Sequence, residues 1–199
     1  MTRGTFGPGT IVLGGGAVLL MGFLTVGFLL PSAWEADAEV VVDVPATALM
    51  PLLDSPEGWR SWTTWPDSGL TRSGPPRGTG ATLAWNDPEL GSGAFTVEAA
   101  STDRAVTYSV EVAGVGGAVM RTSGEIRLEE RPGGTLVRWH EEGDLGRNPL
   151  MGYWARSMRR VQSAEMAKAL DRLAEAAVTA VGAGGGAESP RDRGRSTPG

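Results

Sequence analysis

The stretch AVMRTSGEIRLEERPGGTLVRWHEEGD, residues 118–144, decides the fold. Two runs within it alternate between apolar and polar residues, and RPGG, residues 131–134, separates them. Alternation with a period of two is typical of a β-strand with one buried face, and Pro with Gly favours a tight reversal. The stretch therefore predicts two antiparallel strands joined by a short turn.

The same pattern continues towards the N-terminus. GATLAW (80–85), GAFTVEAA (93–100) and AVTYSVEVA (105–113) alternate and are separated by turn-forming residues, and EADAEVVVDVP (35–45) adds a first strand. We predict an antiparallel meander of about six strands with one polar and one apolar face. The predicted apolar face carries Leu83, Trp85, Phe95, Val97, Val106, Tyr108, Val110, Met120, Ile126, Leu128, Val137 and Trp139.

Helical patterns lie on both sides of these strands. Residues 46–62 predict two short helices, because Leu49, Leu52 and Leu53 have helical spacing and a break at residues 54–56 follows them. Residues 149–178 predict one long helix with an apolar stripe and a polar opposite side. The expected fold is α+β, with a curved sheet that grips the C-terminal helix.

EGWRSWTTWPDSG, residues 57–69, holds three of the seven tryptophans of the chain. Trp59 and Trp62 are one helical turn apart and can share a face, whereas Trp65 precedes Pro66 and enters an extended loop. We expect Trp59 and Trp62 to wall the mouth of a pocket. Contact with a membrane surface is the alternative for Trp65.

A second apolar segment lies near the N-terminus. IVLGGGAVLLMGFLTVGFLL, residues 11–30, has no charge and the length of a membrane-spanning helix, so residues 11–31 are predicted to span a membrane. Arg3 before it and acidic residues after it place the N-terminus in the cytoplasm and the following domain outside. A cleaved signal peptide and a buried core helix are the alternatives.

Composition limits the function classes. The chain has 199 residues, a formal net charge of −5 and no cysteine, so it is a poor match for nucleic acid and has no thiolate chemistry. Residues 1–10 and 182–199 are expected to be tails, the latter disordered because it lacks apolar residues. Abundant Gly, Ala and Arg with little Lys indicates a bacterium of high GC content.

The order of these elements resembles the START-like helix-grip superfamily, and specifically its bacterial polyketide cyclase/dehydrase-like members. VVVDVPATALMPLLDSPEGWRSWTTW (40–65), GTGATLAW (78–85) and KALDRLAEAA (168–177) are the phrases that carry this similarity. The resemblance covers residues 36–178, and we take 36–181 as the domain. It implies a cavity between the sheet and the long helix that holds a hydrophobic small molecule or lipid.

The apolar face itself favours such a cavity, because it mixes aromatic residues and Met with few polar groups. A solid core without ligand is the alternative. Glu141 follows Trp139 on that face, so it is either a buried carboxyl with a raised pKa or a strand-end group that is solvated or paired with Arg147 or Arg156. The candidate ligand-binding residues are Trp59, Trp62, Trp85, Tyr108, Met120, Trp139, Glu141, Trp154 and Met158.

Motifs of catalysis and of cofactor binding are missing. The sequence has no G-x-S-x-G, H-E-x-x-H or P-loop pattern, and GTGATL (78–83) lacks the last glycine of a dinucleotide fingerprint. We predict no catalytic residue, no metal and no cofactor, and leave the oligomeric state open. A membrane-anchored binding domain is the first hypothesis. A cyclase- or dehydrase-type enzyme using Glu141 and Tyr108, or a structural domain with a filled core, is the alternative.

Overall fold

The computed structural model describes residues 8–66, 68–89, 91–101, 104–113, 119–146 and 149–185. A helix, α1 (Pro8–Leu29), precedes the domain, and strand β1 (Ala33–Val42) opens it. Two short helices follow, α2 (Ala46–Leu53) and α3 (Pro56–Arg60). The remaining elements are β2 (Thr71–Ser73), β3 (Thr82–Asp87), β4 (Gly91–Ser101), β5 (Ala105–Ala113), β6 (Val119–Arg131), β7 (Gly134–Asp144) and the long helix α4 (Met151–Gly185).

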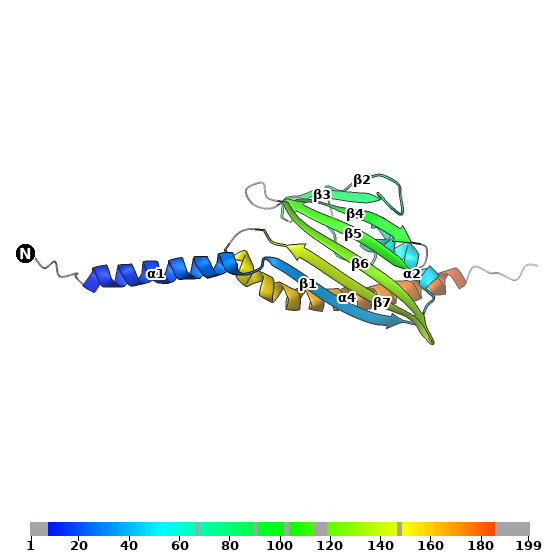
Figure 1. Cartoon of the computed structure of the whole chain (residues 1–199). Helices are drawn as coiled ribbons and strands as arrows, with labels where there is room; N and C mark the ends of the chain where they lie inside the picture. Colours follow the sequence, from blue (N-terminus) through cyan, green and yellow to red (C-terminus); the bar gives the residue numbers. More distant parts are fainter. Residues whose placement is uncertain are drawn as a thin grey trace, which may run out of the picture.

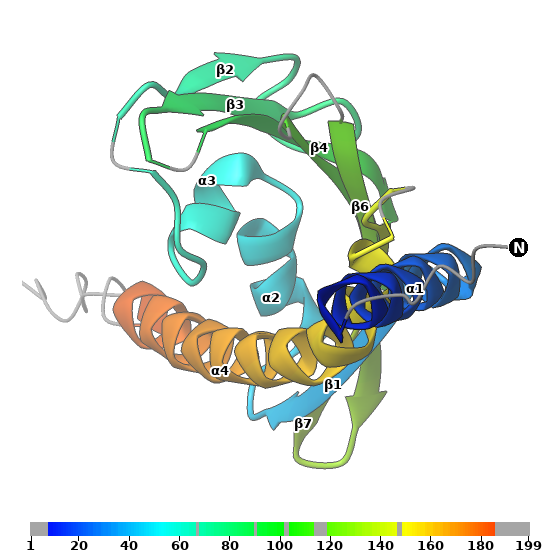
Figure 2. The same cartoon turned by 90° about the vertical axis from the view of Figure 1, so that its left-hand side faces the viewer.

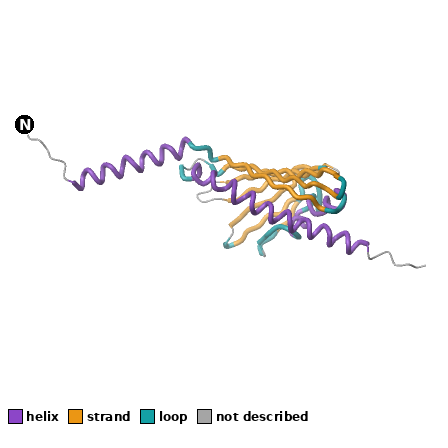
Figure 3. The backbone as a smooth tube through the Cα atoms, turned by 90° about the horizontal axis from the view of Figure 1, so that it is seen from below, coloured by secondary structure: helices purple, strands orange, loops and turns teal. Residues whose placement is uncertain are grey.

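The strands form one antiparallel sheet in the order β1-β7-β6-β5-β4-β3-β2 (Figure 1). The sheet has seven strands, not about six; the strand that was not predicted is the short edge strand β2, whose three residues are all exposed. The predicted α+β helix-grip fold is otherwise confirmed. The sheet curves, and α4 runs obliquely across its concave side (Figure 3).

Helices α2 and α3 lie inside the curve, between the sheet and α4 (Figure 2). Ser55 caps α3 by accepting a hydrogen bond from the Gly58 amide at 3.1 Å, and Pro56 occupies its first turn. The apolar side chains of this segment, including Leu49, Leu53 and Trp59, are buried. The core is therefore built from the concave face of the sheet, one stripe of α4 and the α2–α3 segment.

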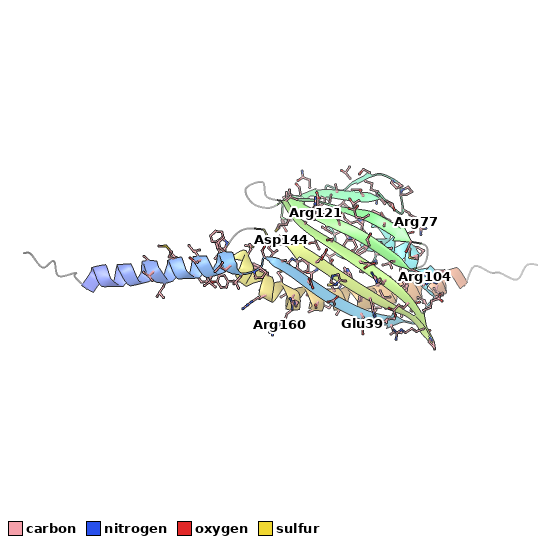
Figure 4. All side chains as sticks on the ribbon, in the orientation of Figure 1. Glu39, Arg77, Arg104, Arg121, Asp144 and Arg160 are labelled. Atoms are coloured by element: carbon pink, nitrogen blue, oxygen red, sulfur yellow. The ribbon has the colours of Figure 1, made fainter. Side chains whose placement is uncertain are left out.

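Charged side chains lie on several strands and on α4, as Figure 4 shows for Arg121, Glu39 and Arg160. Exposed ion pairs join neighbouring strands there, as between Arg138 and Glu39 at 3.4 Å and between Arg138 and Glu129 at 3.2 Å. Pairs this exposed contribute little to stability, about 0–1 kcal/mol each. The apolar concave face thus provides most of the stabilisation of the domain.

Helix α1 packs its C-terminal end against the start of α4. The rings of Phe23 and Tyr153 stack with centroids 4.5 Å apart, and the Tyr153 hydroxyl donates to the Phe23 carbonyl at 2.8 Å. Gly27 permits this approach, because a Cβ there would lie 2.1 Å from the Pro149 carbonyl oxygen. Several apolar side chains of α1 are exposed, among them Phe28 and Leu29.

The prediction of a membrane-spanning helix at residues 11–31 is not supported. Within the part of the chain that the structure describes, no helix is both long and apolar enough to cross a membrane. This finding contradicts the predicted single-pass placement with a cytoplasmic N-terminus and an external domain.

The predicted tails lie mostly outside the described residues. Residues 8–10 belong to α1 and residues 182–185 to α4, whereas residues 1–7 and 186–199 are not described. Strand β1 begins at Ala33, earlier than the predicted domain start at residue 36.

Candidate functional site

Four residues on the adjacent strands β4, β5, β6 and β7 lie side by side in the strand register and form a row across the concave face of the sheet. The strand register pairs Val97 with Tyr108, Tyr108 with Gly124, and Gly124 with Glu141. Gly124 has no side chain, so the Tyr108 ring lies over it; a Cβ at this position would be 2.3 Å from the ring atom Cζ. The gap left by Gly124 therefore lets the Tyr108 hydroxyl on β5 reach the Glu141 carboxyl on β7.

These groups belong to a chain of hydrogen bonds that crosses from the sheet to α4. The Trp139 indole Nε1 donates to the Tyr108 hydroxyl oxygen at 2.7 Å, and that hydroxyl donates to Oε1 of Glu141. The Gln162 amide donates from Nε2 to Oε2 of Glu141 at 2.5 Å. We call Trp139, Tyr108, Glu141 and Gln162 the polar chain.

The polar chain lies in an apolar interior. Glu141 is 5% exposed and Tyr108 is 2% exposed. Burial raises the pKa of Glu141, and the hydrogen bonds from Tyr108 and Gln162 offset this only in part. Burial, together with the nearby Glu141 charge, holds the pKa of Tyr108 well above its usual value. Among the described residues, no Lys or Arg forms an ion pair with Glu141.

An aromatic cluster covers the polar chain. The Trp59 ring lies 4.6 Å from Tyr108 and 5.8 Å from Trp139, both in edge-on geometry. Trp62 lies 5.5 Å from Trp139 and 4.6 Å from Trp59, and Phe95 contacts both Trp59 and Tyr108. These distances are typical of packed aromatic pairs. The indoles of Trp59 on α3 and of Trp62 in the turn after α3 thus occupy the space on the concave face where a ligand cavity was expected.

Three hollows lie at the surface of the described residues, outside the aromatic interior. One of about 660 Å³ lies on the convex face between β1, β6 and β7, and one of about 620 Å³ lies beside it over β5 and β6. Another, of about 440 Å³, lies next to α2 at Asp54 and Arg77. Their walls carry many charged side chains, unlike the aromatic interior.

Five of the nine candidate residues meet in the interior: Trp59, Trp62, Tyr108, Trp139 and Glu141. Trp85 lies further along the concave face, over Gly93 and 5.9 Å from the Trp65 ring, and Met158 on α4 packs against the core. Met120 and Trp154 are not brought to the cluster, because their side chains are 38% and 58% exposed.

The two readings of Glu141 are now distinguished. The carboxyl is buried, and its partners are Tyr108 and Gln162 rather than Arg156; Arg147 lies outside the described residues. Gln162 was missed by the sequence reading. Its position gave a signal, because it lies seven residues after Ala155 and four before Met166, both buried on the stripe of α4 that faces the sheet.

The fold and the buried polar chain define an α+β helix-grip domain with a mixed aromatic and polar interior. A family model described as "Polyketide cyclase / dehydrase and lipid transport" matches residues 33–178. The chain therefore belongs to this family. Comparison with curated proteins finds no match.

Solved structures share the fold at low sequence identity. Norcoclaurine synthase from Thalictrum flavum, a point mutant in complex with a transition-state analogue, aligns with a TM-score of 0.57 and 10% identity over 74% of this chain and 95% of that chain. An uncharacterized protein from Rhizobium leguminosarum aligns with a TM-score of 0.53 and 17% identity, over 74% of this chain and 95% of that chain. A protein from Mesorhizobium loti aligns with a TM-score of 0.51 and 15% identity, over 71% of this chain and 94% of that chain. These similarities concern the fold alone.

Proposed function

We propose that this domain binds a hydrophobic small molecule or lipid on the concave face of its sheet, against the polar chain. The observation that carries this proposal is the buried Glu141, which accepts hydrogen bonds from Tyr108 and Gln162 and forms no ion pair with any Lys or Arg that the structure describes. A fully apolar core would be at least as stable, since an unpaired buried carboxyl is costly. A polar group in this position gives a mainly apolar ligand one fixed point of orientation.

Membership in the family supports the same proposal, because the family description includes lipid transport as well as cyclases and dehydrases. The candidate ligand contacts are Tyr108, Trp139 and Glu141, with Trp59, Trp62, Trp85 and Met158 around them. Met120 and Trp154 are less suitable, given their exposure.

The test uses the full chain and the apolar fluorescent probe N-phenyl-1-naphthylamine. Indole ¹⁵N–¹H NMR signals report on binding at the site, because the Trp139 Nε1–H donates to Tyr108. We expect the probe to shift the Trp139 signal in a saturable manner, and Glu141→Leu to weaken this binding. Ser123→Ala, on the outer face of β6, is the matched control. A Trp139 signal that stays unchanged at saturating probe would refute the proposal.

An enzymatic role is the second proposal, favoured by one observation. The buried Glu141 carboxyl, whose pKa is raised and which contacts a tyrosine hydroxyl, is a candidate general acid or base. Any compound that copurifies with the chain can be identified by native mass spectrometry and organic extraction, then incubated with the protein. Conversion that Glu141→Gln abolishes while binding persists supports catalysis, and an unchanged compound supports binding alone.

A further inference from the structure

The two indoles that fill the concave face belong to one short segment, residues 46–63. We call it the plug segment; it contains α2, α3 and the turn that follows them. Trp59 is 3% exposed and Trp62 is 1% exposed. The Trp59 ring lies against the Trp139 and Tyr108 rings of the polar chain, and the Trp62 ring lies against Trp139. Any ligand that reaches the polar chain must take the place of these indoles.

The plug segment is held together by its own hydrogen bonds. The Trp59 Nε1 donates to the Leu53 carbonyl at 2.5 Å, and the Trp62 Nε1 donates to the Leu52 carbonyl at 2.9 Å. Gly58 lets α3 lie directly on α2, because a Cβ there would be 2.4 Å from the Pro51 carbonyl oxygen. Both indole N–H groups thus have their acceptors inside the plug segment, whether or not the segment contacts the sheet.

Few polar contacts tie the plug segment to the rest of the domain. Arg172 on α4 donates from Nε to the Trp62 carbonyl at 2.8 Å. Arg77 forms an ion pair with Asp54 at 2.9 Å, and the Gly78 amide donates to the Asp54 carbonyl at 2.7 Å. Glu57 pairs with Arg72 at the surface. These contacts lie at the edge of the segment, where Arg77 is 53% exposed.

The polar chain does not depend on the plug segment. Its hydrogen bonds join β5, β7 and α4, and none of them involves residues 46–63. Withdrawal of the two indoles would leave Tyr108, Trp139 and Glu141 in place, with an open aromatic wall in front of them. The site is therefore preformed on the sheet side and closed on the side of α3.

We propose that the plug segment is a removable occupant of the ligand site, which moves as one unit and withdraws Trp59 and Trp62 when ligand enters. This inference rests on the proposed function. The closed form competes with ligand, so the apparent affinity equals the intrinsic affinity multiplied by the fraction of open molecules. Weakening a contact that holds the segment closed should then tighten binding without any change to the binding surface.

Arg172→Met tests this prediction. It removes the hydrogen bond to the Trp62 carbonyl and keeps an unbranched side chain of high helix propensity. Loss of one such charge-assisted bond at a partly exposed site should raise the open fraction, and the affinity for N-phenyl-1-naphthylamine, about fivefold. Lys168→Met is the control, because Lys168 lies one turn earlier on α4 and pairs only with Glu165, at 2.8 Å. The affinity of the Lys168→Met variant for the probe should equal that of the parent protein.

Indole NMR signals provide the second measurement. The probe should shift or broaden the Trp59 and Trp62 signals in the parent protein together with that of Trp139. Equal affinity in the Arg172 and Lys168 variants, or binding that moves Trp139 while Trp59 and Trp62 stay unchanged, would overturn the plug mechanism. If Arg172→Met does not fold, Arg77→Met removes another contact that holds the plug segment, the ion pair with Asp54, and should give the same direction of change. The absence of any Trp139 response in every variant refutes the proposed function instead.

Discussion

Gly124→Ala tests the arrangement on which the polar chain depends. The new Cβ would lie 2.3 Å from Cζ and 2.4 Å from the hydroxyl oxygen of Tyr108. The ring cannot retreat easily, because Trp59 and Phe95 pack against it with centroids 4.6 and 5.4 Å away. The alanine should therefore displace the ring and break its hydrogen bonds to Glu141 and Trp139.

The expected loss of stability follows from three contributions. Overpacking of a filled core costs about 1–3 kcal/mol, and two lost hydrogen bonds cost about 1 kcal/mol each. Replacing glycine within a strand returns about 0.5–1 kcal/mol. The net loss is about 3 kcal/mol. With a urea m-value of about 2 kcal/mol/M, the unfolding midpoint should fall by about 1.5 M.

Urea unfolding followed by tryptophan fluorescence measures this change. Ser123→Ala, at the neighbouring exposed position of β6, is the control and should change stability by less than about 0.5 kcal/mol. In a Tyr108→Val background the obstructing ring is gone, so Gly124→Ala should cost almost nothing. An equal cost in both backgrounds, or a cost below about 0.5 kcal/mol in the parent, would refute the proposed contact between Tyr108 and Gly124.

Two further predictions concern titrating groups. Glu141→Gln should stabilise the protein by on the order of 1 kcal/mol at pH values above the folded-state pKa of Glu141, since it removes a buried charge there and the Gln162 amide can turn to accept a hydrogen bond from the new amide. Because folding raises the pKa of Glu141, the ionised carboxylate lowers the stability of the parent protein above that pKa. The stability advantage of the variant should therefore shrink as the pH falls towards 4.5, the ordinary pKa of a glutamate. An advantage that urea unfolding finds equal at every pH would contradict this. The hydrogen bond to Asp37 at 2.7 Å raises the pKa of His140, so this pair stabilises the fold below the unfolded pKa of His and loses that effect as the pH rises through the raised pKa. Asp37→Asn should lower the His140 pKa in an NMR titration of this one histidine, whereas an unchanged curve would show that Asp37 does not hold it.

The alternation of residues was sufficient to predict the faces of the sheet. Tyr108, Trp139 and Glu141 lie on the concave face as their parity predicts, because side chains of a strand alternate strictly. Met120 follows the same alternation as Ile126, but it lies at the start of β6 and its side chain is 38% exposed, so alternation alone did not predict its burial. The short strand β2 was missed, since three exposed residues, Thr71–Ser73, give no apolar pattern.

The site depends on information that alternation does not contain. The odd or even position of a residue along its strand gives the face on which its side chain lies. The register between strands, however, decides that Tyr108, Gly124 and Glu141 form one row. Gln162 enters the site from an element about twenty residues further along the chain. The position of Trp59 and Trp62 inside the grip also required the path of α3, because helical spacing shows that they share a face but not what that face contacts.

The neighbouring positions of the first and last strands have a mechanical consequence. Helix α1 leads into β1, whose ten residues pair with β7 from Ala33 opposite Asp144 to Val42 opposite Thr135, and α1 extends roughly along the line of β1 (Figure 1). A force applied through α1 would load this ladder in shear, with its hydrogen bonds sharing the tension, rather than opening them one after another. The domain should therefore resist pulling at its N-terminal attachment far better than pulling across the sheet.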